Sequence, residues 1–302
     1  MSQSSSAYSI QSQFFKNAKI LRQEFENVFI DPRSTDPKRF VWDFWYFKDQ
    51  YHHLRTPAHH FFSKKNYIDF HSQLVQWGRT NLGCHDVSPP WLSYYVDGCY
   101  QKMHADVPHG PWAFVYSLTP KNRKFDGGET FILKNDVLNY WQSFNDQAHR
   151  EYKSFFHIIA PAFNQLTVFD PRRPHGVTEV KGTRDPLEAR LVIHGWFVEP
   201  RPYVVGGLGA RQVGLVLNKL FLNLQDFLNQ QSLLHGCLAL RLSVNKSGTV
   251  SQFKIVSNSL MDLHLPENKN LKLIHTLKNY FEKVKFPRSS KPSEMTIPLL
   301  FR

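Results

Sequence analysis

Three residues of this sequence have the types and the spacing to bind one metal ion. His104 and Asp106 stand two positions apart in the stretch KMHADVPHG, and such residues project to the same face of an extended strand. His175, in FDPRRPHGV, follows a strand pattern and stands at a turn, where a neighbouring strand could bring it to the first pair. The sequence therefore predicts that His104, Asp106 and His175 bind one metal ion.

Two imidazoles and one carboxylate form the facial triad of non-haem Fe(II) oxygenases, whose open positions take a chelating cosubstrate and O2. A 2-oxo acid bound there would need a cation for its distant carboxylate. Arg190 opens the strand pattern EARLVIHGWF, where an unpaired charge would be costly, and its guanidinium suits a bidentate carboxylate contact. Alternation places His194 and Trp196 on the face of Arg190, so we expect both to line the same pocket.

Strands must position these residues. Before residue 199 the chain consists mostly of short apolar or alternating runs between turn signals, which predict six or more strands and hence a barrel or sandwich. One helix is expected at 66–81. The stretch RFVWDFWYF (39–47) is interpreted as a core strand covering the barrel, with substrate stacking as the alternative. The first ten or so residues are expected to form a frayed tail.

The order of the motifs resembles the prolyl-hydroxylase-like branch of the 2-oxoglutarate/Fe(II)-dependent dioxygenases, over roughly residues 80–200. The resemblance implies a mostly β, double-stranded β-helix (jelly-roll) core with flanking helices. It implies that the triad binds iron and that Arg190 binds 2-oxoglutarate. Tyr94 matches a tyrosine that contacts 2-oxoglutarate ten residues before the first His, and Tyr116 stands where the usual Tyr-Leu-Asn strand end reads Tyr-Ser-Leu-Thr.

The resemblance also implies a reaction. Fe(II), 2-oxoglutarate and O2, with ascorbate as an optional reductant, would yield succinate, CO2 and a hydroxylated aliphatic C–H. The carboxylate of Asp106 favours hydroxylation, because halogenating relatives lack it. A prolyl residue of a protein or peptide is the expected substrate, and a free amino acid or natural-product intermediate is the alternative. Two departures are Val192, where many relatives have Ser, and the long spacing from His175 to Arg190.

A domain boundary is expected near EPRPYVVGGLGARQ (199–212), which divides an oxygenase domain at 1–203 from a small α+β domain at 204–302. The second domain should contain helices at 211–231 and 267–286, two strands around a turn at 246–248, and a final strand. It resembles the C-terminal domain of TonB-type energy transducers, a binding module in that family. The glycines at 206–209 are interpreted as a flexible joint.

Composition limits the compartment and the partners. Three Cys without a framework spacing, no apolar run long enough for a membrane span and no signal peptide predict a cytoplasmic protein. The net charge is +12, and residues 204–302 hold 13 Lys/Arg against 5 Asp/Glu. This basic part could bind nucleic acid, an acidic protein partner or an anionic surface, or be a solvated surface. Its charges are scattered rather than gathered in a stripe, which favours the solvated surface, and nucleic acid is not the expected partner.

Two other classes of protein share some of these features. A cupin-like metal-binding barrel would not need Arg190, and an adaptor with a degenerate oxygenase domain would not need an intact triad. Several further residues are expected to have no part in metal binding: His109 as a loop residue, Arg172 and Arg173 as solvent or cosubstrate-entrance residues, and the doublets His52-His53 and His59-His60 as surface or packing residues.

Overall fold

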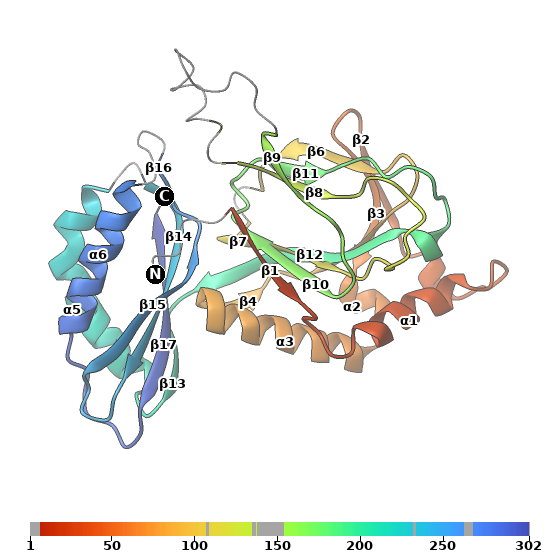
Figure 1. Ribbon diagram of the computed structural model, residues 1–302. Coiled ribbons are helices and arrows are strands. Elements are labelled where there is room, and N and C mark those ends of the chain that lie inside the picture. The colour runs from red at the N-terminus through yellow and green to blue at the C-terminus, as the bar shows by residue number, and fades with distance from the viewer. Residues whose placement is uncertain are drawn as a thin grey trace, which may run out of the picture. The chain divides into compact units, whose positions relative to one another are not determined.

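The computed structural model describes residues 7–106, 109–134, 137, 154–231, 234–262 and 268–301. They divide into two compact units, shown in Figure 1. The first unit comprises Ala7–Leu74 and Val87–Phe197. The second is built mainly from Val75–Asp86 and Val198–Arg302.

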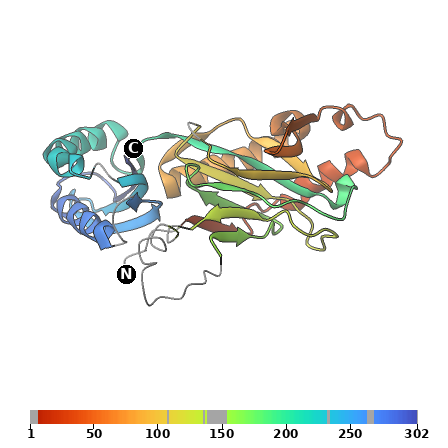
Figure 2. The same ribbon diagram turned by 90° about the horizontal axis from the view of Figure 1, so that it is seen from above.

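The first unit is a curled antiparallel sheet. Its main strands lie in the order β1-β10-β7-β12-β5-β3-β6-β11-β8-β9, and β2 pairs with β3. Their bounds are β1 Tyr8–Ser12, β2 Asp43–Phe47, β3 Tyr51–Pro57, β5 Trp91–Tyr95, β6 Tyr100–His104, β7 Trp112–Ser117, β8 Thr130–Leu133, β9 Phe156–Ile159, β10 Gln165–Phe169, β11 His175–Val177 and β12 Arg190–Pro200. Most paired strands are far apart in sequence, and the sheet curves on itself (Figures 1 and 2). The predicted mostly β, jelly-roll core is confirmed.

Helices cover one side of this sheet. These are α1 (Ala18–Phe29), the short α2 (Ala58–Phe61) and α3 (Lys64–Leu82), and α3 confirms the helix predicted at 66–81. Phe70 of α3 lies with its ring 4.8 Å from that of Tyr116 on β7, and it also packs on Phe14 and Phe15. The amphipathic pattern thus buries an aromatic face of the helix against the outside of the sheet.

Two expectations for the N-terminal part are wrong. Residues Tyr8–Ser12 form β1 and pair with β10, although the first six residues of the expected tail lie outside the described part. The stretch 39–47 is no core strand: β2 pairs with β3 alone among the described strands, and Phe40 and Phe44 are 75% and 58% exposed. Its aromatic residues had suggested burial, but a strand at the edge of a sheet leaves one side in solvent.

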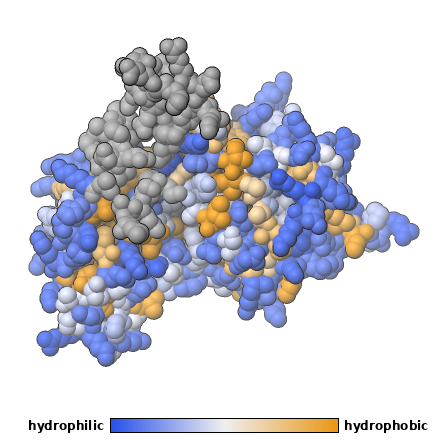
Figure 3. All heavy atoms as spheres, in the orientation of Figure 1, coloured by the Kyte–Doolittle hydropathy of each residue, from blue (hydrophilic) through white to orange (hydrophobic). Residues whose placement is uncertain are grey.

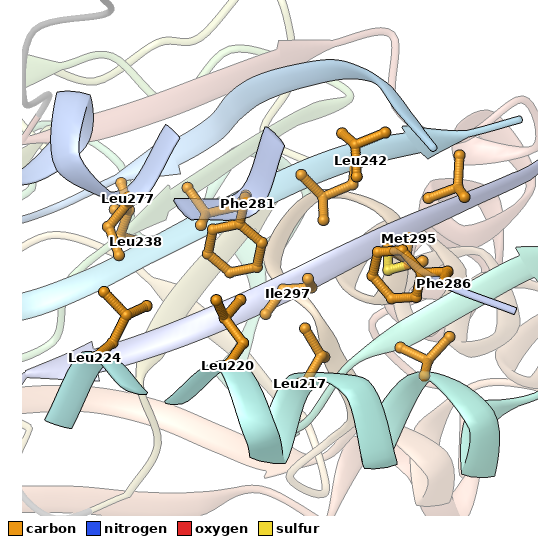
Figure 4. Packing of buried hydrophobic residues seen from close by; sticks show 14 of the residues in the cluster. Leu217, Leu220, Leu224, Leu238, Leu242, Leu277, Phe281, Phe286, Met295 and Ile297 are labelled. Atoms are coloured by element: carbon orange, nitrogen blue, oxygen red, sulfur yellow. The ribbon is translucent and has the colours of Figure 1, made fainter. Parts of the chain in front are cut away.

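The second unit is an α+β fold, as predicted. Strands β13 (Tyr203–Gly206), β17 (Ser293–Phe301), β14 (Leu234–Val244) and β15 (Val250–Asn258) lie in that order, and β16 (Met261–Asp262) pairs with β14. Helices α5 (Ala210–Asn229) and α6 (Asn268–Lys283) cover the same face of the sheet (Figure 2). Figure 4 shows their shared core, which includes Leu220, Phe281 and Ile297.

The glycines at 206–209 form no flexible joint. Gly206 ends β13, which pairs with β17, and the backbone N–H groups of Gly207 and Leu208 both donate to Ser293 Oγ at 2.9 Å. The second unit also contains residues from before the predicted boundary. The carbonyl of Thr80, at the C-terminal end of α3, accepts hydrogen bonds from Arg241 and, at 2.7 Å, from Thr296. A division at 203/204 therefore stays a prediction.

The surface and the cysteines can be described briefly. On the face shown in Figure 3, hydrophilic side chains predominate and apolar ones gather in separate patches. Cys84, Cys99 and Cys237 are all buried, and none of them forms a disulfide among the described residues. Among the described residues, no helix combines the length and the apolar character that a membrane span requires.

Candidate active site

The structure brings His104, Asp106 and His175 together. His104 and His175 are direct partners in the antiparallel pairing of β6 with β11, which places their rings 4.3 Å apart. One carboxylate oxygen of Asp106 lies 3.2 Å from His104 Nε2 and the other lies 3.3 Å from His175 Nε2. One potential ligand atom from each residue lies within 4.8 Å of the others, which suits a single ion.

Hydrogen bonds on the far side of each ring favour the tautomer that a metal needs. His104 Nδ1 lies 2.8 Å from the carbonyl oxygen of Lys102, and His175 Nδ1 lies 2.8 Å from that of Arg173. A neutral ring that donates through Nδ1–H keeps a lone pair on Nε2. Both Nε2 atoms therefore face Asp106 as potential ligands, the arrangement that outer hydrogen bonds impose on metal-binding histidines.

The protonation of the triad follows from its contacts. Burial alone would raise the pKa of Asp106, but the contacts of its carboxylate with the imidazoles of His104 and His175 outweigh burial and hold the pKa well below its usual range. Burial would lower the pKa of His104, but its hydrogen bonds to Asp106 and to the Lys102 carbonyl raise it above the ordinary value. Asp106 is thus a carboxylate at neutral pH, as a hard cation requires.

Arg190 lines the same cavity, and one of its donor atoms has no partner among the described residues. It is 1% exposed, its Nε donates to the Gly128 carbonyl at 2.7 Å, and its Nη2 donates to Thr130 Oγ1 at 3.2 Å. Its Nη1 is buried without a hydrogen-bond partner among the described residues. Burial lowers the pKa of Arg190, yet an arginine stays charged in proteins. A buried cation with a free donor fits a carboxylate ligand.

The glycine pair at 127–128 explains how Arg190 is held. Gly127 has a φ of +79°, and a Cβ there would lie 1.8 Å from the carbonyl oxygen of Glu179. Only glycine allows this close approach, and the next residue, Gly128, then turns its carbonyl to Arg190. The glycine pair of KFDGGET thus positions the guanidinium of Arg190.

We expect Gly127→Ala to destabilise the first unit and to raise the KM for 2-oxoglutarate. The control is Gly98→Ala, because Gly98 has a similar φ of +81° but nothing within 4 Å of its Cβ position. Both variants carry the left-handed backbone penalty of roughly 1–2 kcal/mol, and only Gly127→Ala adds the clash. Urea unfolding and 2-oxoglutarate kinetics check this expectation, and equal effects of the two substitutions would contradict it.

Tyr94 and Tyr116 lie outside the cavity, so their predicted contacts with the cosubstrate need correction. Tyr94 packs against Trp42 and Phe25 on the other face of β5. Tyr116 donates its hydroxyl hydrogen to Asn164 at 2.8 Å in the core beside α3. Tyr95 is the tyrosine that faces Arg190, whose Cζ lies 4.6 Å from its ring centroid. The one-residue offset reverses the face of the strand.

The cavity has a volume of about 500 Å³, within the range of small-molecule sites. His194 and Trp196 line it, as expected, together with the triad and Arg190. His194 Nε2 is hydrogen-bonded to Ser93 Oγ at 2.8 Å, and burial lowers the pKa of His194 to about 4. Trp196 Nε1 donates to Asp106 at 3.3 Å, so this tryptophan orients the carboxylate as well as forming a wall.

Two further residues, His53 and Arg55, line the cavity but were not predicted from the sequence. They stand two apart on β3, and alternation places both on the inner face of the sheet. His53 is 1% exposed, and its ring centroid lies 5.0 Å from that of Tyr95, on which it stacks. The sequence interpretation of His52-His53 as surface or packing residues had given His53 no part in the site. The pattern Tyr-x-His-x-Arg from residue 51 was the available signal.

Acid should destabilise the protein through His53. Burial, followed by the neighbouring His194 and Arg55, lowers the pKa of His53 to about 2. The unfolded chain binds this proton near pH 6.5 and the folded one does not, so stability falls as the pH drops below 6.5. The loss reaches about 2 kcal/mol at pH 5, at 1.36 kcal/mol per unit. Urea unfolding at pH 7 and pH 5 should show this loss in the wild type, and a smaller one in His53→Phe. An unchanged loss in the variant would contradict the expectation.

The residues that were expected to have no part in metal binding lie outside the metal-binding cluster. His109 stacks on Trp196, with ring centroids 4.2 Å apart, and does not join the cluster. Arg172 pairs with Asp170 at 2.6 Å. Arg173 is 1% exposed, so it does not lie in solvent, and its alternative place at the cosubstrate entrance stays a prediction. His59 and His60 lie exposed on α2, as expected of surface residues.

Comparison with known proteins identifies the family of the segment that holds the site. Residues 90–198 match the model of the 2OG-Fe(II) oxygenase superfamily. A search among curated proteins found no match. Two solved structures are similar at 16% identity and a TM-score of 0.43, each covering 64% of this chain. One is a Pseudomonas putida prolyl-4-hydroxylase, covered over 92% of its length. The other is a Trichoplax adhaerens prolyl hydroxylase in complex with a peptide fragment of the hypoxia inducible factor oxygen degradation domain, covered over 83%.

Residues 90–198 are therefore a 2OG-Fe(II) oxygenase domain, and the chain is a 2-oxoglutarate-dependent dioxygenase. This class uses Fe(II), 2-oxoglutarate and O2. The residues present fit these groups, because the donor set of two imidazoles and one carboxylate suits Fe(II) and the free Nη1 of Arg190 suits a carboxylate.

Proposed function

We propose that this dioxygenase is a hydroxylase of an aliphatic C–H, with a prolyl residue of a peptide or protein as its substrate. The main support is that His104, Asp106 and His175 converge in one cavity. The same cavity is lined by Arg190, a buried arginine whose Nη1 has no partner among the described residues. The two similar prolyl hydroxylases make proline the first substrate to test.

In this proposal each residue has a distinct role. His104, Asp106 and His175 hold Fe(II), and Arg190 holds the C5 carboxylate of 2-oxoglutarate. When bound, iron with 2-oxoglutarate and O2 supplies the oxidant for the C–H bond, while 2-oxoglutarate becomes succinate and CO2. Trp196 keeps the Asp106 carboxylate oriented, and His194, neutral at physiological pH, lines the space beside the triad.

A noncatalytic metal-binding barrel is the weaker reading. Such a barrel would have no use for Arg190, because burying a guanidinium whose Nη1 lacks a partner is costly without a ligand. An adaptor with a degenerate oxygenase domain would not need the two imidazoles and the carboxylate to converge. It would also not need the hydrogen bonds that orient His104 and His175 through Nδ1.

The test is an anaerobic titration with Fe(II) and 2-oxoglutarate, followed by succinate release in air with a panel of prolyl peptides, free amino acids and buffer alone. A visible charge-transfer band that needs both additions, and succinate formed above the uncoupled rate with a prolyl peptide, would support the proposal. Iron binding without any 2-oxoglutarate turnover would refute it.

We further propose that residues 204–302 recruit a protein substrate or an acidic partner. The support is their resemblance to a binding module and their basic charge. Charge reversal at exposed Lys219 and Lys254 should then slow turnover of an acidic protein substrate but not of a short peptide. If charge reversal changed turnover of the protein substrate no more than turnover of the peptide, the recruitment proposal would be contradicted.

A further inference from the structure

Arg55 occupies an unusual position on the cavity wall. Its guanidinium lies between two indole rings, with Cζ 3.0 Å from the centroid of Trp45 and 4.2 Å from that of Trp91. Its Nε contacts Asp43, its cross-strand partner on β2, at 3.4 Å. The stacking fixes the plane of the guanidinium, and the Asp43 contact fixes its rotation within that plane.

This arrangement leaves one edge of Arg55 free. Its two terminal nitrogens have no hydrogen-bond partner among the described residues, although the side chain is only 16% exposed. The single carboxylate beside it belongs to Asp43, whose side chain is 60% exposed. A purely structural arginine would use its terminal nitrogens on protein acceptors, whereas this one offers them to the cavity that it lines.

A second polar group beside Arg55 also lacks a partner. His53 is 1% exposed, and neither of its ring nitrogens has a hydrogen-bond partner among the described residues. Its ring lies 5.6 Å from that of Trp45, its cross-strand partner. Buried polar atoms are normally satisfied, so two orphan nitrogens in a cavity indicate a ligand group at this position.

His53 and Arg55 form a part of the cavity distinct from Arg190. The pairing order β12-β5-β3 places Tyr95 between Arg190 and His53, and both contact its ring. Arg55 stands opposite Ser93, one step further along the strands than Tyr95. The triad, His194 and both arginines all line this one cavity. The cavity thus offers two separate anion-binding positions.

We propose that the substrate of this enzyme carries a carboxylate, and that Arg55 and His53 bind it. The inference rests on the proposed function, since 2-oxoglutarate occupies Arg190 and leaves the Arg55 edge to the second reactant. A guanidinium with a free pair of terminal nitrogens recognises a planar carboxylate through two hydrogen bonds. The carboxylate belongs either to a free amino acid or peptide C-terminus, or to an acidic side chain beside the hydroxylated residue.

Matched acid and amide pairs test the proposal. The probes are L-proline with L-prolinamide, a short prolyl peptide with a free or an amidated C-terminus, and a prolyl peptide with Glu or Gln beside the proline. Binding to the anaerobic protein loaded with Fe(II) and 2-oxoglutarate is followed by tryptophan fluorescence, because Trp45 and Trp91 flank Arg55. Succinate release in air is the second readout. At least one acid should bind tenfold or more tightly than its amide, and the pair that does so identifies the source of the carboxylate.

Variants then assign the preference to the residue. Arg55→Gln should bring the acid-to-amide ratio of that pair close to one, and Arg55→Lys should restore part of it. The exposed control Arg33→Gln should keep the wild-type ratio. The ratio is measured within each variant, so a partly unfolded sample does not change it. No acid preference in the wild type, or a preference that survives in Arg55→Gln, would overturn the proposal. If the wild-type protein showed no 2-oxoglutarate turnover at all, this result would instead overturn the proposed function.

Discussion

Replacing His175 by alanine is expected to abolish iron binding and 2-oxoglutarate turnover. Losing a residue that merely orients a metal ligand typically costs 10–100-fold in affinity, so losing one of three ligands should cost more than about 100-fold. The structure adds a reason, because Asp106 faces both rings, at 3.2 and 3.3 Å. Without His175 the second oxygen of Asp106 loses this contact as well.

Iron content after anaerobic reconstitution and desalting measures this effect directly. His60→Ala is the matched control, since His60 is an exposed histidine on α2 and should keep stoichiometric iron. A thermal melt of each metal-free protein separates lost binding from lost folding. A folded His175→Ala protein with full stoichiometric iron would show that the triad is not the metal site.

Part of the candidate site could be predicted from the sequence because some of its residues stand two apart on one strand. Two-residue alternation alone places His104 with Asp106 and Arg190 with His194. The pairing of β6 with β11, which brings His175 to His104, is a contact between distant strands, and only the order of the motifs pointed to it. Amphipathic periodicity was equally sufficient for the long helices α3 and α5.

The errors arose where an answer depended on strand pairing. Tyr94 and Tyr95 are neighbours, so one of them must face the cavity and the other the core, and the spacing to His104 favoured the wrong one. The aromatic stretch at 39–47 carries no sign that its strand lies at an edge. His53 and Arg55 were not predicted because their position depends on strand pairing. Arg55 is flanked by Trp91 on a neighbouring strand and by Trp45 across the hairpin. The ring nitrogens of His53 have no partner among the described residues. Burial and pairing decide such cases, and composition shows neither.

Replacing Arg190 by alanine should raise the KM for 2-oxoglutarate steeply while iron still binds. Removing one member of a desolvated charge pair costs about 2–5 kcal/mol, which corresponds to a rise of roughly 30-fold to several thousand-fold. Nη1 of Arg190 has no hydrogen-bond partner among the described residues, which predicts that the effect falls mainly on ligand binding. Part of the cost is structural, because the Gly128 carbonyl would lose its partner at 2.7 Å.

Arg190→Lys separates these two contributions. Lysine keeps the positive charge but cannot hold the Gly128 carbonyl and a carboxylate in the fixed geometry of a guanidinium, so we expect an intermediate KM. Arg33→Ala, which removes an exposed arginine, should leave the KM unchanged. Anaerobic titration with 2-oxoglutarate and steady-state kinetics should agree, because the lost contact holds the cosubstrate before O2 reacts. If Arg190→Ala kept wild-type cosubstrate affinity, the C5 carboxylate would have to bind elsewhere, and Arg55, the other arginine that lines the cavity, would be the residue to substitute next.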